Sequence, residues 1–313
     1  MKESDYPRSI LEFQQRFSTE EDCEEYLYKM RWPNRFICPV CGDTEAYYIQ
    51  SKRAFQCRLN RHQTYLTAGT VMHRTRTPLR YWFWAAYLLT SLKPGISAIQ
   101  LENQLGINYE VAFQILHKLR ASMVNPFRDR ITGIVEVDET YIGGTSTGGK
   151  RGRGSELDVV IVAVEDKDGR AGRIRMRHIP NVSKRSLLPF IEDSIKKGST
   201  IVTDGFKGYS DLNRYGYIHK PVIQKVSGKE SSLPLCHIVI SNLKTFIRGT
   251  YHGVSPQHLQ AYLNEFVFRF NRRFYPMAGF QTILGLSSKV SFPTYKSLYS
   301  GKYEHPNPVA YDE

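Results

Sequence analysis

Two aspartates in apolar, strand-like segments are the strongest candidates for chemistry in this sequence. Residues 133–142, GIVEVDETYI, alternate in polarity, so Glu136 and Asp138 are expected on one face of a strand. A carboxylate inside an apolar strand costs several kcal/mol unless it is paired or bound to a metal. Asp204 follows the apolar residues 201–203 and, taken alone, would be a turn residue before a glycine. If Asp138 and Asp204 meet, their oxygens can hold Mg²⁺, and two such ions ~4 Å apart can promote phosphodiester displacement.

The cysteines predict a separate zinc site. Cys38 and Cys41 form a CxxC followed by glycine, and two thiolates at this spacing can reach one Zn²⁺. Cys57 is a third candidate ligand, but Asn60 stands where a zinc ribbon would place its fourth. His62 is the nearest substitute and would complete a Cys3His site. The alternative is a ribbon that has lost its metal and persists through packing.

The stretch between these two sites predicts three helices. Residues 79–92 are aromatic and apolar, and residues 97–105 and 109–123 have helical periodicity on either side of a turn at Gly106. Two short helices joined by a glycine turn are typical of a DNA-binding helix-turn-helix, although a plain helical hairpin has the same pattern. The candidate groove-facing residues are Asn108, Tyr109, Glu110, Gln114 and Lys118.

The charge favours a polyanionic partner. The 313 residues carry 43 Lys and Arg against 30 Asp and Glu, a net charge of +13. Residues 1–30 are acidic, so the positive excess lies over the rest of the chain, as suits nucleic acid. Residues 143–154 contain six glycines and predict a basic loop whose candidate DNA contacts are Lys150, Arg151 and Arg153.

Several functional classes are disfavoured. The longest apolar run, residues 81–89, is too short for a membrane span of ~20 residues, and no signal-peptide core precedes it. Neither a GxSxG nor a GxxxxGK[ST] motif is present. We therefore expect a cytoplasmic, nucleoid-associated protein with no membrane partner.

The order of elements after residue 131 predicts an α/β core. Three strands (residues 133–142, 157–164 and 172–179) precede a helix, a short strand ending at Asp204 and further helices. This order is that of a ribonuclease H-like mixed sheet, in which the first and fourth strands are neighbours. Asp138 and Asp204 would then meet.

Three segments resemble a known family. VEVDETYIGG, IVTDGFKGY and HIVISNLKTFIRGTYHGVSPQHLQAYLNEFVFRFNRR are similar to DDE-type insertion-sequence transposases with an N-terminal zinc ribbon, the ISXO-type branch, over roughly residues 15–285. The resemblance implies binding of terminal inverted repeats, strand cleavage and transfer of 3′ hydroxyls to target DNA. It also implies two Mg²⁺ or Mn²⁺ ions, Asp138 and Asp204 as the first two catalytic acids, and a homodimer on double-stranded DNA.

The third catalytic position departs from that pattern. The family usually has Glu there, with Lys or Arg seven residues later, and His237 stands seven residues before Lys244. The two would share a helix face, whereas the rival Asn242 would lie on another. Lys244 and Arg248 would bind phosphate. Arg272 and Arg273, at a predicted helix end, are either DNA contacts or part of a solvated terminus.

The sequence as a whole predicts an α+β multidomain protein: a zinc ribbon, a helix-turn-helix and a ribonuclease H-like α/β catalytic core with a mixed sheet. Two alternatives remain, a DNA-binding regulator or inactive copy that does not cut DNA, and a structure-specific nuclease. The expected segments are an acidic helical segment (1–30), zinc ribbon (31–72), helix-turn-helix (78–126), catalytic domain (131–285) and tail (286–313).

Overall fold

The computed structural model describes residues 7–124, 128–143, 157–222 and 233–287. Within them the chain forms two compact units. The N-terminal unit runs to Met123 and takes up the chain again from Phe274, while Val124–Arg273 form the C-terminal unit. We expected the last domain to continue to residue 285, but the helix after Phe274 contacts helices of the N-terminal unit. Each unit is described by itself below.

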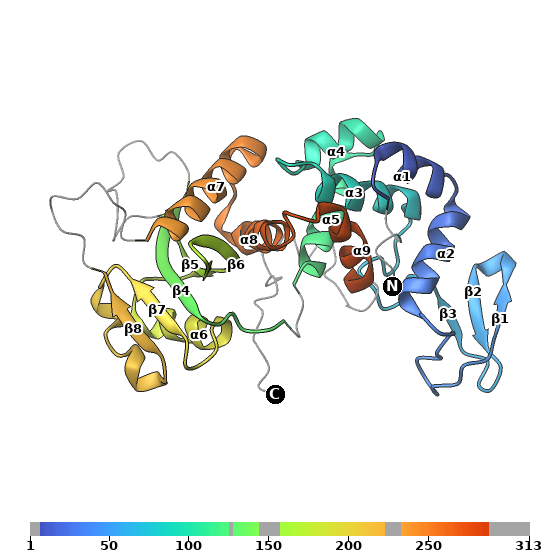
Figure 1. Ribbon diagram of the computed structural model, residues 1–313. Coiled ribbons are helices and arrows are strands. Elements are labelled where there is room, and N and C mark those ends of the chain that lie inside the picture. The colour runs from blue at the N-terminus through green and yellow to red at the C-terminus, as the bar shows by residue number, and fades with distance from the viewer. Residues whose placement is uncertain (1–6, 125–127, 144–156, 223–232, 288–313) are drawn as a thin grey trace. The chain divides into compact units, whose positions relative to one another are not determined.

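The N-terminal unit begins with two short helices followed by a small antiparallel sheet (Figure 1). The second helix begins directly after Thr19, which forms a capping box with Asp22. The Thr19 hydroxyl accepts from the Asp22 amide at 3.1 Å, and the Asp22 carboxylate accepts from the Thr19 amide at 2.8 Å. The elements are α1 (Ile10–Arg16), α2 (Glu20–Arg31), β1 (Ala46–Ile49), β2 (Ala54–Cys57) and β3 (Gln63–Tyr65), with the strands in the order β1-β2-β3.

Three further helices match the ranges expected from periodicity. They are α3 (Leu79–Ser91), α4 (Ala98–Leu105) and α5 (Tyr109–Ser122). Gly106 ends α4 in the left-handed conformation at φ 63°, which glycine adopts at little cost. Asn108 then caps α5 by accepting the Val111 amide at 2.9 Å. Within the described ranges, no helix is both long and apolar enough to cross a membrane.

The last helix, α9 (Pro276–Ser287), completes an aromatic core in the N-terminal unit. Phe280 is fully buried, and its ring centroid lies 5.8 Å from that of Phe13, 5.6 Å from that of Phe17 and 5.9 Å from that of Phe83. Aromatic pairs at these separations add to the free energy gained by burying their area. The chain therefore returns to this unit because α9 supplies part of its core.

A five-stranded mixed sheet forms the centre of the C-terminal unit. Its order is β6-β5-β4-β7-β8, with antiparallel pairing among β6, β5 and β4 and parallel pairing among β4, β7 and β8. β4 and β7 are neighbours, as expected. The strands are β4 (Ile134–Ile142), β5 (Asp158–Lys167), β6 (Arg170–Ile179), β7 (Thr200–Thr203) and β8 (Ile218–Pro221).

Helices cover both faces of this sheet (Figure 1). On one face, α7 (Pro234–Tyr251) and α8 (Pro256–Asn271) bury an apolar cluster with alternate residues of β4, β5 and β6. On the other, α6 (Lys184–Ser194) and the turns after β7 bury a second cluster. Successive residues of β4 therefore face different layers.

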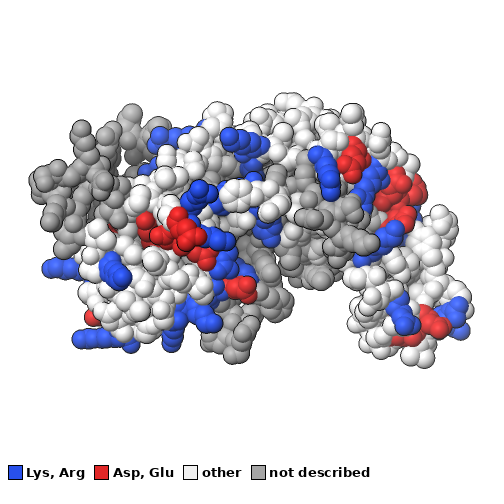
Figure 2. All heavy atoms as spheres, viewed as in Figure 1, with Lys and Arg blue, Asp and Glu red and all other residues white. Residues whose placement is uncertain are grey.

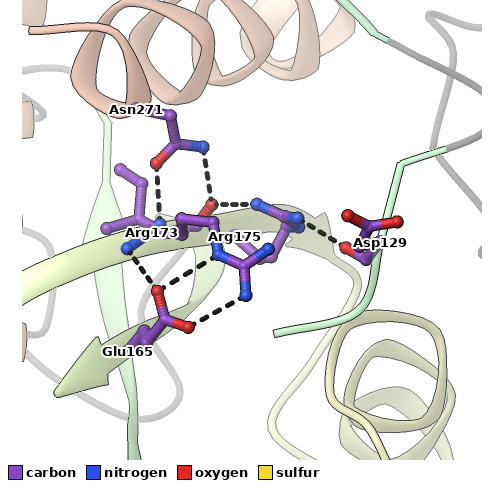
Figure 3. Close-up of polar contacts among 6 residues, drawn as sticks. Asp129, Glu165, Arg173, Arg175 and Asn271 are labelled. Carbon is purple, nitrogen blue, oxygen red and sulfur yellow. Dashed lines mark hydrogen bonds and ion pairs between the residues drawn. The ribbon is translucent and has the colours of Figure 1, made fainter. Parts of the chain in front are cut away.

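The edge strand β6 is closed by carboxamide side chains of α8 (Figure 3). Asn271 accepts from the Ile174 amide at 2.8 Å and donates to the Ile174 carbonyl at 3.2 Å, and Gln260 accepts from the His178 amide at 2.9 Å. An open strand edge is a template for unwanted pairing, so these bonds both satisfy the backbone and block the edge. The same strand is held by Arg173, which pairs with Glu165 at 2.9 Å, and by Arg175, which donates to the Asp129 carbonyl at 2.7 Å.

We predict that Asn271→Ala lowers the free energy of unfolding of the C-terminal unit by about 1–3 kcal/mol, because the Ile174 amide and carbonyl both lose a partner. Urea denaturation measures this change. Gln257→Ala, an exposed position on the same helix, is the matched control. Equal stabilities of the two variants would contradict this role of Asn271.

Candidate functional site

Parallel pairing brings Asp138 and Asp204 to the same level of the sheet. Ile134 of β4 pairs with Thr200 of β7 and Glu136 with Val202, and two more steps along this register place Asp204 beside Asp138. β7 ends at Thr203, so Asp204 is the first residue of the turn that follows. Its carboxylate accepts from the Phe206 amide at 2.9 Å, which fixes the turn.

The surroundings of Asp138 suit a bound cation. Burial, followed by the charge of neighbouring Glu139, raises the pKa of Asp138 to about 6, and Asp204 contributes in the same direction. In Figure 2, acidic side chains gather over β4 and basic side chains border them. Asp138 is half-buried and Asp204 is exposed. Carboxylate oxygens that repel one another are donors that Mg²⁺ or Mn²⁺ prefers, so the two residues fit a divalent metal.

Helix α7 places His237 beside Asp138. The His237 Nε2 lies 3.6 Å from the Asp138 Oδ2, and the imidazole is about half exposed. His237, Lys244 and Arg248 line one open groove of about 440 Å³ along α7. Asn242 is exposed and does not line this groove. Of the two candidates for the third position, His237 is therefore the one next to the first aspartate.

Glu136 has a role that the sequence analysis did not identify. Its side chain is buried, and its carboxylate accepts the amides of Cys236, at 2.8 Å, and Leu235 in the first turn of α7. An anion at a helix N-terminus satisfies free amides and interacts favourably with the helix dipole. Burial raises the pKa of Glu136. The sequence indicated only that Glu136 lies on the same strand face as Asp138. It did not indicate that the first turn of α7 is the partner of Glu136.

Glu139, on the opposite face of β4, accepts a hydrogen bond from the segment that follows Asp204. The Tyr209 hydroxyl donates to Glu139 at 2.9 Å, and the Tyr209 ring is fully buried. Tyr209 ends the short 3-10 helix Lys207–Tyr209, which begins three residues after Asp204. Burial, then the charge of Glu139, raises the pKa of Tyr209 well above its ordinary value, so the hydroxyl stays a donor.

The predicted zinc ligands only partly converge. The sulfurs of Cys38, Cys41 and Cys57 lie within 4.8 Å of one another, and three thiolates at one point support a structural Zn²⁺. His62 is exposed and is not part of this group of described metal-binding side chains. The side chain found beside the Cys38 sulfur is that of Asn60, with Nδ2 at 3.7 Å.

Some predicted DNA contacts have other partners in the structure. Lys118 was expected to face a DNA groove, but it is buried with its ammonium 5.7 Å from the centre of the Trp82 ring, and burial lowers its pKa. The Asn108 side chain is used as a cap, while Tyr109 and Glu110 are exposed and Gln114 is half-buried. Lys150, Arg151 and Arg153 lie outside the described residues.

The two arginines at the end of α8 also have structural roles. Arg273 donates to the carbonyl of Phe270 at 2.9 Å and to that of Ala171, which joins the helix end to β6. The Arg272 guanidinium lies 3.9 Å from the centre of the Phe268 ring. These contacts occupy donors that we had considered for DNA.

We predict that Glu136→Ala costs about 1–3 kcal/mol of unfolding free energy, because it leaves two amides of α7 without an acceptor in a buried place. Glu136→Gln retains an acceptor oxygen and should recover most of that loss. Thermal or urea unfolding of both variants measures this difference. If Gln and Ala are equally destabilising, the carboxylate does not act as a cap.

Comparisons with known proteins agree with this division of the chain. A family model described as an ISXO2-like transposase domain matches residues 130–271, and one described as a transposase zinc-ribbon domain matches residues 18–63. An uncharacterized transposase-like protein of Haemophilus influenzae is 27% identical over 99 residues, which are 30% of this chain and 76% of that protein. The first match contains Asp138, Asp204 and His237, and the second contains the cysteine cluster. The chain therefore carries a transposase zinc-ribbon domain followed by an ISXO2-like transposase domain.

Proposed function

We propose that this protein binds the terminal inverted repeats of an insertion sequence, cleaves DNA strands there and transfers the 3′ hydroxyl ends to target DNA. The observation that carries the proposal is that His237, which lines the groove along α7, lies 3.6 Å from Asp138, and that the charge of Asp204 acts on the same Asp138 carboxylate. The mixed sheet, with its first strand between an antiparallel and a parallel neighbour, supports a ribonuclease H-like core.

In this proposal Asp138 and Asp204 hold two Mg²⁺ or Mn²⁺ ions. When bound, such ions supply charge stabilisation for the attacking and leaving oxygens of an in-line phosphodiester displacement. Asp138 and Asp204 would hold these ions from a central strand and from a turn that its own hydrogen bond fixes. His237 occupies the third position, where it orients an attacking water or a DNA hydroxyl beside Asp138.

The α7 groove binds the backbone of the strand that is cut. His237, Lys244 and Arg248 occur at helical spacing, and eleven residues of helix span about 16 Å, enough for several nucleotides. Lys244 and Arg248 place positive charge along this length, and phosphate contacts fix the register of a nucleic acid without reading its sequence. The helix pair α4 and α5 is the proposed helix-turn-helix for repeat recognition, and joining two element ends calls for a homodimer on DNA.

We predict that the purified protein cuts a duplex carrying its element's terminal repeat in Mg²⁺ or Mn²⁺ and leaves 3′ hydroxyls. Asp138→Ala and Asp204→Ala should each reduce cutting on the order of 10³-fold, because each removes a metal ligand. His237→Ala should lose about 100-fold, while Asn242→Ala, on the neighbouring helix face, should stay near the native rate. Mapping of the cut ends by gel electrophoresis measures these effects.

The same assay separates the alternatives. Tight binding without cuts in either metal would indicate a regulator or an inactive copy. Cutting of branched duplexes without end specificity or strand joining would indicate a structure-specific nuclease.

A second prediction concerns Lys244. Lys244→Ala should weaken binding about equally to all DNA sequences and reduce the slope of log K against log salt concentration by about 1, because one phosphate contact is lost. Fluorescence anisotropy at several salt concentrations measures the slope. Asn242→Ala is the control. An unchanged slope for Lys244→Ala would show that Lys244 does not contact a DNA phosphate.

A further inference from the structure

The two turns that present the zinc-binding side chains have the same backbone hydrogen bonds. In the first, the Cys38 amide donates to the Asp43 carbonyl at 2.8 Å, and the Gly42 amide donates to the Cys38 carbonyl at 2.9 Å. In the second, the Cys57 amide donates to the His62 carbonyl at 3.0 Å, and the Arg61 amide donates to the Cys57 carbonyl at 3.0 Å. Each turn therefore presents two ligand positions three residues apart.

The left-handed residue of each turn confirms this equivalence. Gly42 has φ 75°, and Arg61, at the matching place, has φ 58°. A side chain other than glycine adopts this conformation at a cost, so the second turn has the shape of the first although its sequence favours that shape less.

The second turn thus presents Asn60 where the first presents Cys41. The Asp43 amide donates to the Cys41 sulfur, and the amide at the corresponding place, that of His62, donates to the Asn60 Oδ1 at 2.9 Å. The amide oxygen of Asn60 therefore has the hydrogen bond that a ligand sulfur would have there. His62 corresponds to Asp43, which stands two residues beyond the ligand position.

The distances fit a tetrahedral site. Bond lengths of 2.3 Å to sulfur and about 2.1 Å to oxygen place two sulfurs about 3.8 Å apart and a sulfur and an oxygen about 3.6 Å apart. The Cys41 and Cys57 sulfurs are 3.6 Å apart, and the Asn60 Oδ1 lies 3.8 Å from the Cys38 sulfur. Asp43 also approaches one thiol, with its Oδ2 3.6 Å from the Cys57 sulfur. It is not among the described side chains whose donor atoms all lie within 4.8 Å of one another.

We propose that Zn²⁺ in this ribbon is held by the thiolates of Cys38, Cys41 and Cys57, with the Asn60 Oδ1 closing the fourth position in place of a fourth cysteine. His62 is not a ligand. An amide oxygen is a neutral and harder donor than a thiolate, so this site holds zinc less tightly than a four-cysteine ribbon would. The weaker ligand is Asn60 in the second turn, and the backbone of this turn would also present a cysteine at that position.

Cobalt substitution and zinc affinity in the full-length chain test this assignment under reducing conditions. Replacing Zn²⁺ by Co²⁺ gives a thiolate charge-transfer absorption that grows with the number of sulfur ligands. Asn60→Cys should raise it by about one third, from three thiolates to four, and raise zinc affinity at least about tenfold in chelator competition. Asn60→Ala should lower zinc affinity about tenfold, and His62→Ala should leave both readouts unchanged.

Three results would overturn the assignment. The first is a tenfold loss of zinc affinity in His62→Ala with none in Asn60→Ala, which would make the imidazole the ligand. The second is a tenfold loss of zinc affinity in Asp43→Ala and in neither Asn60→Ala nor His62→Ala. The third is an Asn60→Cys variant that folds, as judged by circular dichroism, but whose Co²⁺ form shows no increase in charge-transfer absorption. If Asn60→Cys does not fold, the comparison of the Asn60→Ala and His62→Ala affinities still decides between the two residues.

Discussion

Strand β4 carries three carboxylates within four residues at the centre of a sheet, and the partners of these groups determine how the C-terminal unit is assembled. Glu136 accepts the first amides of α7, and Glu139 accepts the hydroxyl of Tyr209 below the turn that follows β7. Both elements are thereby tied to the strand that carries Asp138. Between them Asp138 faces Asp204 and His237, and burial among acids keeps its pKa high. Glu136 and Glu139 have protein partners and hold the neighbouring elements in place. Asp138, which lies between them, has surroundings that suit a cation.

The antiparallel and parallel sides of the sheet around β4 differ in their contacts and in the length of their strands. On the antiparallel side, α8 closes β6 through the carboxamides of Asn271 and Gln260, and Arg273 joins the helix end to the same strand. On the parallel side, β7 is only four residues long, so Asp204 leaves the sheet level with Asp138 rather than further along. The long strands carry the edge contacts, and the early end of the short strand places Asp204 in a turn beside Asp138.

The two turns of the zinc ribbon share a backbone conformation although their side chains differ. Backbone hydrogen bonds and one left-handed residue define each turn, and they are the same around Asn60 as around Cys41. Three cysteines still converge. The backbone of the second turn is therefore the basis for proposing Asn60 rather than His62 as the fourth ligand.

The sequence by itself determined the features that depend on neighbouring residues. The glycine turn at residue 106 and the alternation around Asp138 both act over four residues or fewer, and the elements appeared where these patterns predicted them. The pattern of strands and helices was also sufficient to predict that β4 and β7 are neighbours. The resemblance to a transposase family with a zinc ribbon was confirmed by the family matches.

Only the tertiary structure decided which groups meet across long separations. Glu136 and Cys236 are 100 positions apart, and Asn271 and Ile174 are 97, so no local rule could pair them. Lys118 looked available for DNA because helical periodicity does not say how many sides of a helix will be covered, and α5 is buried around that residue. Asn60 and His62 are both close to Cys57 in sequence, and only the hydrogen bonds of the folded turn show which of them faces the sulfurs. Local sequence determines the conformation of a segment, whereas the partner of a buried polar group depends on which distant segment the fold brings to it.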